Sequence, residues 1–204
     1  MRRYLKFSVR TLLILLTAAC LWMGYAALSY RSQQQAYHRI QALGGNLAWK
    51  TTSPEWLVNL LGRDPFAYVW EVSFVDVSIR GDDLKLLSGL KRLEQLSIAQ
   101  NRTFTGDGLQ HLANLGDLRM IYLYDVPVTD EGLQQLPPLP ALEQLYVLGT
   151  RITDECLPLV ENRSHLQVVQ LGGSELLTKA AVDELDQRMH ACQVSWSGQG
   201  YSAD

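Results

Sequence analysis

Cysteine and histidine are scarce in this sequence, and neither occurs in a spacing that binds metal. The three cysteines, Cys20, Cys156 and Cys192, form no CxxC pair, which argues against a zinc site or a dithiol redox motif. The four histidines lack the HExxH spacing of zinc hydrolases. No GxSxG segment, the nucleophile motif of α/β-hydrolases, is present. We therefore expect no catalysis, no cofactor and no metal site.

Cys156 and Cys192 leave two interpretations open. In an oxidising compartment outside the cytoplasm they could form a disulfide with each other. A lone cysteine is more often a small buried apolar residue that packs like alanine. The sequence alone does not decide between a disulfide and two core positions.

Basic residues are sparse beyond the first ten positions. The chain has 18 Lys and Arg against 21 Asp and Glu, and Arg2, Arg3, Lys6 and Arg10 are four of the 18. The remainder therefore has 14 basic and 21 acidic residues, a net charge of −7. An acidic folded part argues against nucleic-acid binding, which depends on clustered Lys and Arg.

One long uncharged segment follows the basic residues. Residues 11–30 have the sequence TLLILLTAACLWMGYAALSY, and Tyr25 and Tyr30 lie toward its far end. Twenty helical residues rise about 30 Å, the thickness of a bilayer core, and tyrosine suits its interface. The sequence thus predicts a transmembrane helix over 11–30 and a basic cytoplasmic tail over 1–10. The rest of the chain is then extracytoplasmic, in the periplasm or at the cell surface.

Two processed forms compete with this signal-anchor. A signal peptidase could cleave at Gly24-Tyr25-Ala26, but the apolar run continues as a full span. A lipoprotein site could end at Cys20, but Thr17 stands where leucine is expected. The mature chain would also begin with the strongly apolar CLWMGYAAL. We favour the uncleaved anchor.

The next two segments connect the anchor to the folded part. Residues 31–45 are predicted to form a helical stalk that ends at Gly44-Gly45, with a thin apolar stripe at Ala36, Ile40 and Leu43. Residues 46–68 are predicted to form an N-terminal cap. It would contain a strand at 47–49 and a helix at 56–61, the latter introduced by Ser53-Pro54. With Trp49 and Trp56, this cap could cover the open edge of the repeats.

The rest of the chain is repetitive. Segments LEQLSIAQN, LRMIYLYDV, LEQLYVLGT and LQVVQLGGS begin at leucines 93, 118, 142 and 166, which are 25, 24 and 24 residues apart. A weaker copy, VWEVSFVDV, begins at Val69. Each copy is followed by a second block: IRGDDLKLL, FTGDGLQHL, VTDEGLQQL, ITDECLPLV and LTKAAVDEL.

The two blocks predict two different elements. The LxxLxL spacing places alternate residues on one side of a strand, and the TDEGL-like block starts a helix with capping and acidic residues. Neither element buries its apolar side alone, so the copies must stack. We predict an α/β solenoid of five repeats of about 24 residues over 69–189. It would be a right-handed β-α superhelix with a parallel concave sheet. A C-terminal capping strand is predicted within 190–204, where Val194 and Trp196 alternate.

These blocks resemble leucine-rich repeats of the ribonuclease-inhibitor-like and F-box-associated type, with the pattern LxxLxLxx(N/T)xITDxGLxxL. The match covers about residues 69–196. Val126 in place of Asn or Thr, and Cys156 in place of the helix Gly, depart from the pattern. The whole layout is similar to short bacterial membrane-anchored leucine-rich-repeat proteins. The resemblance implies protein binding. No F-box segment precedes the repeats, so a ubiquitin-ligase role is not implied.

The strand alternation predicts which side chains point away from the core. In the two middle copies these residues are mostly large, and strands about 4.8 Å apart join them into one patch. Tyrosine is enriched at binding hot spots, although it also packs well across neighbouring strands. The predicted protein-binding residues on the concave face are Met120, Tyr122, Tyr124, Tyr146, Leu148, Gln95, Gln144 and Gln170.

The acidic pairs Asp130-Glu131 and Asp154-Glu155 have two explanations. They could serve acid–base chemistry or metal binding, or they could cap and stabilise helix starts. Their recurrence at the same place in the repeat favours the structural explanation. We expect a membrane-anchored protein that binds an unknown protein ligand on the extracytoplasmic side. The alternatives are a regulatory or signalling subunit that acts through a membrane partner, and a purely structural envelope protein.

Overall fold

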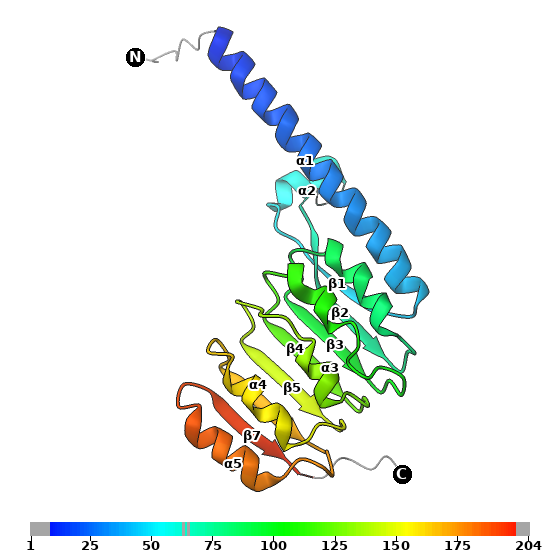
Figure 1. Ribbon diagram of the computed structural model, residues 1–204. Coiled ribbons are helices and arrows are strands. Elements are labelled where there is room, and N and C mark those ends of the chain that lie inside the picture. Colours follow the sequence, from blue (N-terminus) through cyan, green and yellow to red (C-terminus); the bar gives the residue numbers. More distant parts are fainter. Residues whose placement is uncertain (1–8, 63, 65, 199–204) are drawn as a thin grey trace.

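A computed structural model describes residues 9–62, 64 and 66–198 (Figure 1). Most of the predicted basic tail and residues 199–204 lie outside this part. The α-helices are α1 Val9–Ala42, α2 Glu55–Leu61, α3 Asp130–Gln134, α4 Leu157–Glu161 and α5 Lys179–Arg188. The 3-10 helices are η1 Gly81–Gly89, η2 Leu109–Asn114 and η3 Asp154–Cys156. The strands are β1 Asn46–Lys50, β2 Tyr68–Val75, β3 Gln95–Ala99, β4 Met120–Tyr124, β5 Gln144–Leu148, β6 Val168–Gly172 and β7 Gln193–Ser197.

The strands form one seven-stranded sheet in chain order, β1 to β7. Strand β1 pairs with β2 antiparallel, and every later pair is parallel. Equivalent positions of the repeats are direct partners, so Leu96, Ile121, Leu145 and Val169 stand in one row. Figure 1 shows the helical segments of the repeats along one face of this sheet. The predicted α/β stack of repeats with a parallel sheet is confirmed.

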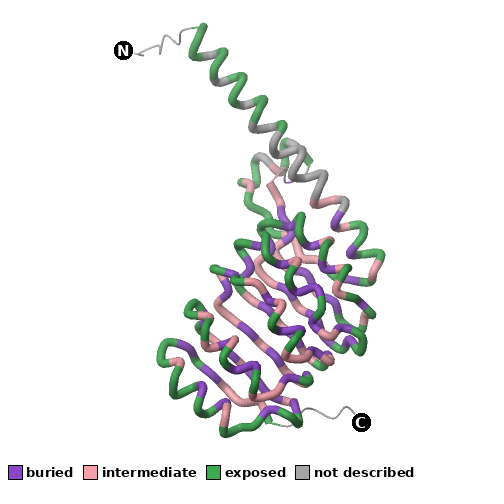
Figure 2. Tube along the Cα trace, viewed as in Figure 1, coloured by how far each residue is buried: buried purple, intermediate pink, exposed green. Residues whose placement is uncertain are grey.

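The core lies between the sheet and the helical segments. The inward residues of β2 to β6 are buried, and Leu96 and Ile98 in β3, for example, have no exposed surface. The helical segments contribute further leucines, such as Leu109 and Leu112 in η2. Figure 2 shows buried residues recurring along the strands and on the facing side of the helices. Each leucine buried in this way contributes about 2 kcal/mol.

The helical segments that follow the strands of the repeats are less regular than the helices that the sequence predicts. The first two, η1 and η2, are 3-10 helices, and the fourth begins as η3 and continues as α4. A short connection between strands favours 3-10 geometry, because a 3-10 helix rises further per residue than an α-helix. Threonine side chains cap α3, η3 and α5 by accepting hydrogen bonds from backbone N–H groups. The pairs are Thr129 with Gly132, Thr153 with Glu155, and Thr178 with Ala181. The threonines therefore provide the helix capping that the sequence predicts.

A buried polar position follows the strands. Asn101 is 1% exposed, and its side chain donates to the carbonyl of Val77 at 2.6 Å and accepts from the N–H of Phe104 at 2.9 Å. Ser174 occupies the equivalent place and donates to the carbonyl of Ile152 at 2.7 Å. Val126 is buried at this position and Val77 occupies it in the first copy, so two repeats carry an apolar substitute.

The C-terminal turns of α1 do not form a free stalk. Ile40 is fully buried and Ala36 is 7% exposed, and both belong to the same core cluster as Phe74 of β2. A Cβ on Gly45 would lie 2.6 Å from the Ile40 side chain and 2.7 Å from the Phe74 ring, so only glycine fits. The helix predicted over 31–45 is present, but its last turns pack on the first repeat and do not stand apart from it. The first repeat has an open end, and α1 covers it.

The predicted cap is correct in its elements and partly wrong in its contacts. Strand β1 extends the sheet, and the Trp49 ring packs against Tyr37 of α1 with 5.8 Å between centroids. Helix α2 ends at Gly62, whose φ of 69° is the left-handed conformation that favours glycine. Trp56, which we expected to cover the repeats, is 66% exposed instead. The reason is that α1 and β1 already occupy that end.

Helix α1 is continuous over 34 residues and contains the predicted span 11–30. Within the described residues, no helix has the combined length and apolarity needed to cross a membrane. The side chains of Tyr25 and Tyr30, predicted to mark the interface, lie outside the described ones.

Asp64 organises the loop that follows α2. Its carboxylate accepts hydrogen bonds from the N–H groups of Thr52 (2.8 Å), Ser53 (3.1 Å) and Phe66 (2.8 Å), and from the Ser53 hydroxyl. Burial alone would raise the pKa of this group. The four hydrogen bonds outweigh burial and lower the pKa from 3.8 to about 2. Asp64 thus joins the segments on both sides of α2.

Replacing Ile40 with alanine should lower the free energy of unfolding by about 2–5 kcal/mol, because the variant leaves a cavity in the core. The neighbouring Gln41 is exposed, so Gln41→Ala should change it by less than about 0.5 kcal/mol. Urea unfolding of the full chain in detergent, followed by circular dichroism, compares the two. Equal effects would contradict the packing of α1 on the first repeat.

Asp64 should make the cap sensitive to acid. Because its pKa is lower in the folded chain than in the unfolded chain, its stabilisation is fully present above about pH 4 and is lost as the pH falls toward about 2. Asp64→Asn should lose stability at neutral pH and respond less to acid over that window. Thermal unfolding at several pH values measures this, with the exposed Asp117→Asn as control. An unchanged acid response in Asp64→Asn would refute the role of this carboxylate.

Candidate functional site

The candidate site is the open face of the sheet, defined as the outward positions of β3 to β6. The parallel pairing places these positions in three rows, since partners across neighbouring strands share a face. The first row is Gln95, Met120, Gln144 and Val168. The second is Ser97, Tyr122, Tyr146 and Gln170. The third is Ala99, Tyr124, Leu148 and Gly172. The structure therefore brings all eight predicted binding residues together on one face.

The tyrosine cluster, Tyr122, Tyr124 and Tyr146, forms the centre of the open face. The Tyr122 ring lies 6.0 Å from that of Tyr124, with 13° between the planes, and 5.7 Å from that of Tyr146, with 53°. The Tyr146 hydroxyl donates to the Gln144 side chain at 3.3 Å. All three tyrosines are half-buried. The rings therefore support one another and still present surface to a ligand.

Two outward positions are less accessible than the alternation predicts. Ala99 is 7% exposed, and Gly172 is also buried. Ala99 stands between Val75 and Tyr124, whose larger side chains shield its methyl group. Val75, at the end of β2, is 45% exposed. The accessible surface is therefore concentrated on the tyrosine cluster and the residues beside it.

The open face carries no charged side chain at any outward position from β3 to β6. Burial, and then the neighbouring Tyr124 and Tyr146, raises the pKa of the Tyr122 hydroxyl. The Tyr122 hydroxyl therefore stays neutral at physiological pH. A surface of aromatic rings, amides and hydroxyls without charge is suited to contacts with apolar and neutral polar groups.

Charged residues lie instead at the edges of this face. Near the strand starts, Glu94 pairs with Lys50 at 3.0 Å and accepts a hydrogen bond from the Tyr68 hydroxyl at 2.7 Å. These hydrogen bonds outweigh burial and lower the pKa of Glu94. At the strand ends, Asp76 and Asp125 are exposed in the left-handed conformation, with φ of 55° and 51°. The open face thus lies between two charged edges.

The acidic pairs have structural partners. Asp130 accepts from the N–H of Thr153 at 2.9 Å and from its hydroxyl at 2.6 Å. Asp154 makes the same two bonds with Thr178, each 2.8 Å long. These contacts connect one repeat to the next, which the sequence pattern did not reveal. Within the described residues, no group of three or more potential ligands is placed to hold a metal ion.

The cysteines are free thiols. Cys156 and Cys192 are both buried, so they occupy the core and do not form the disulfide that the sequence left open. Burial, and then the carboxylates of Asp130 and Asp154, raises the pKa of the Cys156 thiol to about 12. Such a thiol is a poor nucleophile near neutral pH.

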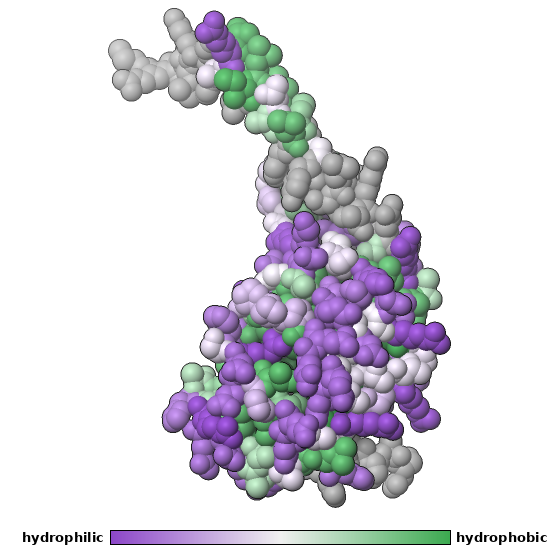
Figure 3. All heavy atoms as spheres, viewed as in Figure 1, coloured by the Kyte–Doolittle hydropathy of each residue, from purple (hydrophilic) through white to green (hydrophobic). Residues whose placement is uncertain are grey.

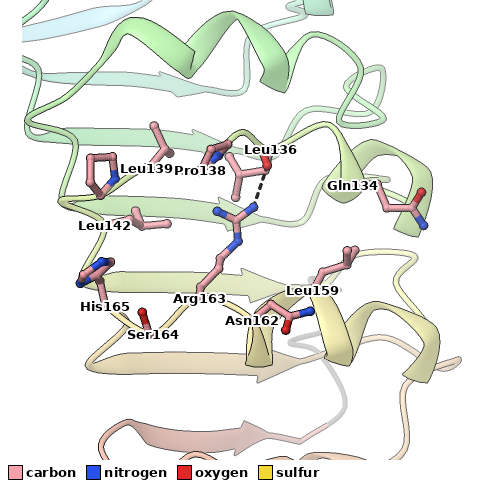
Figure 4. Close-up of a pocket in the computed structure, with 11 residues that line it drawn as sticks. Gln134, Leu136, Pro138, Leu139, Leu142, Leu159, Asn162, Arg163, Ser164 and His165 are labelled. Carbon is pink, nitrogen blue, oxygen red and sulfur yellow. Dashed lines mark hydrogen bonds between the residues drawn. The ribbon is translucent and has the colours of Figure 1, made fainter.

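A hollow of about 480 Å³ lies away from the open face, between the segment before β5 and the segment after α4 (Figure 4). Its apolar lining includes Leu136, Leu139 and Leu142. The Arg163 side chain points across it and donates to the carbonyls of Leu136 at 2.7 Å and Pro137 at 2.9 Å. Burial lowers the pKa of this guanidinium. Since both terminal nitrogens hold the proline-rich loop, we assign Arg163 a structural role.

No family model matches the chain, and no curated protein matches it. Among solved structures, it is similar to an internalin from Listeria monocytogenes, with 15% sequence identity and a TM-score of 0.35. The similarity covers 59% of this chain and 38% of the internalin chain, so this chain matches well under half of that protein. A likeness of this size does not define a family.

Proposed function

We propose that this chain is a membrane-anchored leucine-rich-repeat protein that binds another protein through the open face of its sheet. The observation that carries the proposal is the tyrosine cluster. The Tyr122 ring lies within about 6 Å of the Tyr124 and Tyr146 rings, and no outward position of β3 to β6 carries a charge. Tyrosines in such a cluster offer large, rigid contact area together with a polar tip.

Helix α1 supports the membrane part of the proposal. Its N-terminal half carries exposed Leu13, Ile14, Leu16 and Leu21, each more than half accessible. Figure 3 shows hydrophobic residues gathered along this part of the helix, away from the solenoid. Exposed apolar side chains of this size favour a lipid environment. With basic residues before the span, the repeats would face the extracytoplasmic side.

The proposal includes binding without catalysis and without nucleic acid. Asp130 and Asp154 accept hydrogen bonds from Thr153 and Thr178, and the buried Cys156 is a weak nucleophile. The open face offers no basic groups for phosphates. A regulatory or signalling role through a membrane partner would use the same open face and differs only in what the partner does.

Removing two rings of the cluster should weaken partner binding. Tyr122→Ala combined with Tyr146→Ala should reduce capture of a partner from membranes of the source cells at least tenfold, since hot-spot tyrosines contribute about 2 kcal/mol or more each. Pull-down with the chain in detergent, quantified by mass spectrometry, measures the loss.

Leu176 provides the matched control, because it is 59% exposed and lies outside the open face. Leu176→Ala removes apolar surface of comparable kind and should leave capture unchanged. Circular dichroism verifies that every variant is folded. If the double tyrosine variant captures the same partner as well as the unchanged chain does, the open face is not the binding site.

A further inference from the structure

A pair of large apolar side chains on α2 is not explained by the solenoid core. Trp56 is 66% exposed and Leu60 is 72% exposed. The two residues are four positions apart, so they lie on the same side of the helix. Isolated exposed leucines are common, but a tryptophan and a leucine together on one short helix form a defined apolar surface. We call it the α2 surface.

Chain geometry places α2 at a particular height along α1. After the turn at Gly44, β1 runs back along α1, since the Trp49 ring contacts Tyr37. Five residues lie between Trp49 and Glu55, the first residue of α2, so the Cα atoms of these two residues are at most about 20 Å apart. That distance equals about 13 residues of α-helix, so α2 lies no farther along α1 from Tyr37 than about residue 24. Figure 1 likewise draws α2 at the height of the middle of α1.

This height coincides with the outer end of the proposed membrane span. Residues 11–30 form the uncharged segment, and its two tyrosines fall at positions 25 and 30. Tryptophan is enriched at the membrane–water interface, where its ring contacts both lipid and headgroups. The α2 surface therefore combines the residue types and the depth of an interfacial contact.

We propose that the α2 surface is a second membrane contact, in which Trp56 and Leu60 enter the headgroup region of the outer leaflet beside α1. This inference rests on the proposed membrane anchor. The loop carrying α2 is held on both sides by Asp64, which accepts bonds from Thr52 and Ser53 before the helix and from Phe66 after it. A contact here fixes how the solenoid is turned about the axis of α1. The open face then has a fixed direction relative to the membrane.

Fluorescence quenching by brominated lipid tests this contact. The chain has five tryptophans, of which Trp22 lies within the proposed span, so the background variant is Trp22→Phe. This variant of the full chain is reconstituted in vesicles of phosphatidylcholine and phosphatidylglycerol with bromines close to the headgroups. We expect quenching relative to unbrominated lipid, and Trp56→Phe should abolish it. The matched control is Trp196→Phe at the far end of the sheet, in β7, which should leave the quenching intact.

The outcomes separate the contact from the anchor. Flotation of the vesicles shows whether the chain binds them. Co-flotation with quenching that depends on Trp56 supports the α2 contact. Co-flotation with the same quenching in the Trp56→Phe variant overturns the α2 contact and leaves the anchor standing. Absence of co-flotation overturns both. Shielding of Trp56 by a second copy of the chain would appear as no lipid quenching in a dimeric sample, which also overturns the contact.

Discussion

Every repeat of this chain depends on its neighbours to bury its leucines. A unit of about 24 residues supplies one strand and one short helical segment, which together cannot enclose a core. In-register parallel pairing solves this, because it aligns Leu96, Ile121 and Leu145 into a continuous row. The same constraint leaves two open ends. The C-terminal turns of α1 and strand β1 close one end, and α5 and β7 form the other.

The features that follow from local spacing could be predicted from the sequence. Alternation within each strand and the constant repeat length determine the sheet order, the inward residues and all eight positions of the candidate site. Features that depend on contacts between residues far apart in the sequence could not be predicted in this way. The stripe at Ala36 and Ile40 is too thin to reveal that α1 packs on Phe74. The bonds between Asp130 and Thr153 need the stacked arrangement before they can be seen. The exposure of an outward residue also depends on the size of its neighbours.

The register that builds the core also builds the candidate site. Placing Tyr122 directly beside Tyr146 requires only that their inward neighbours pair, so the tyrosine cluster adds no constraint to folding. Because charges are confined to the edges, the open face can accept a partner without desolvating an ion. The proposed anchor and the proposed α2 contact would give this face a position and a direction at a membrane.

Photo-crosslinking in the native membrane tests the central claim most directly. The full chain would carry benzoylphenylalanine in place of Tyr122, of Tyr146, or of the exposed Gln110 in η2. Positions 122 and 146 should capture the same protein, and position 110 should not, because η2 lies on the other side of the sheet. Capture of that protein from position 110, with none from 122 or 146, would contradict a binding site on the open face.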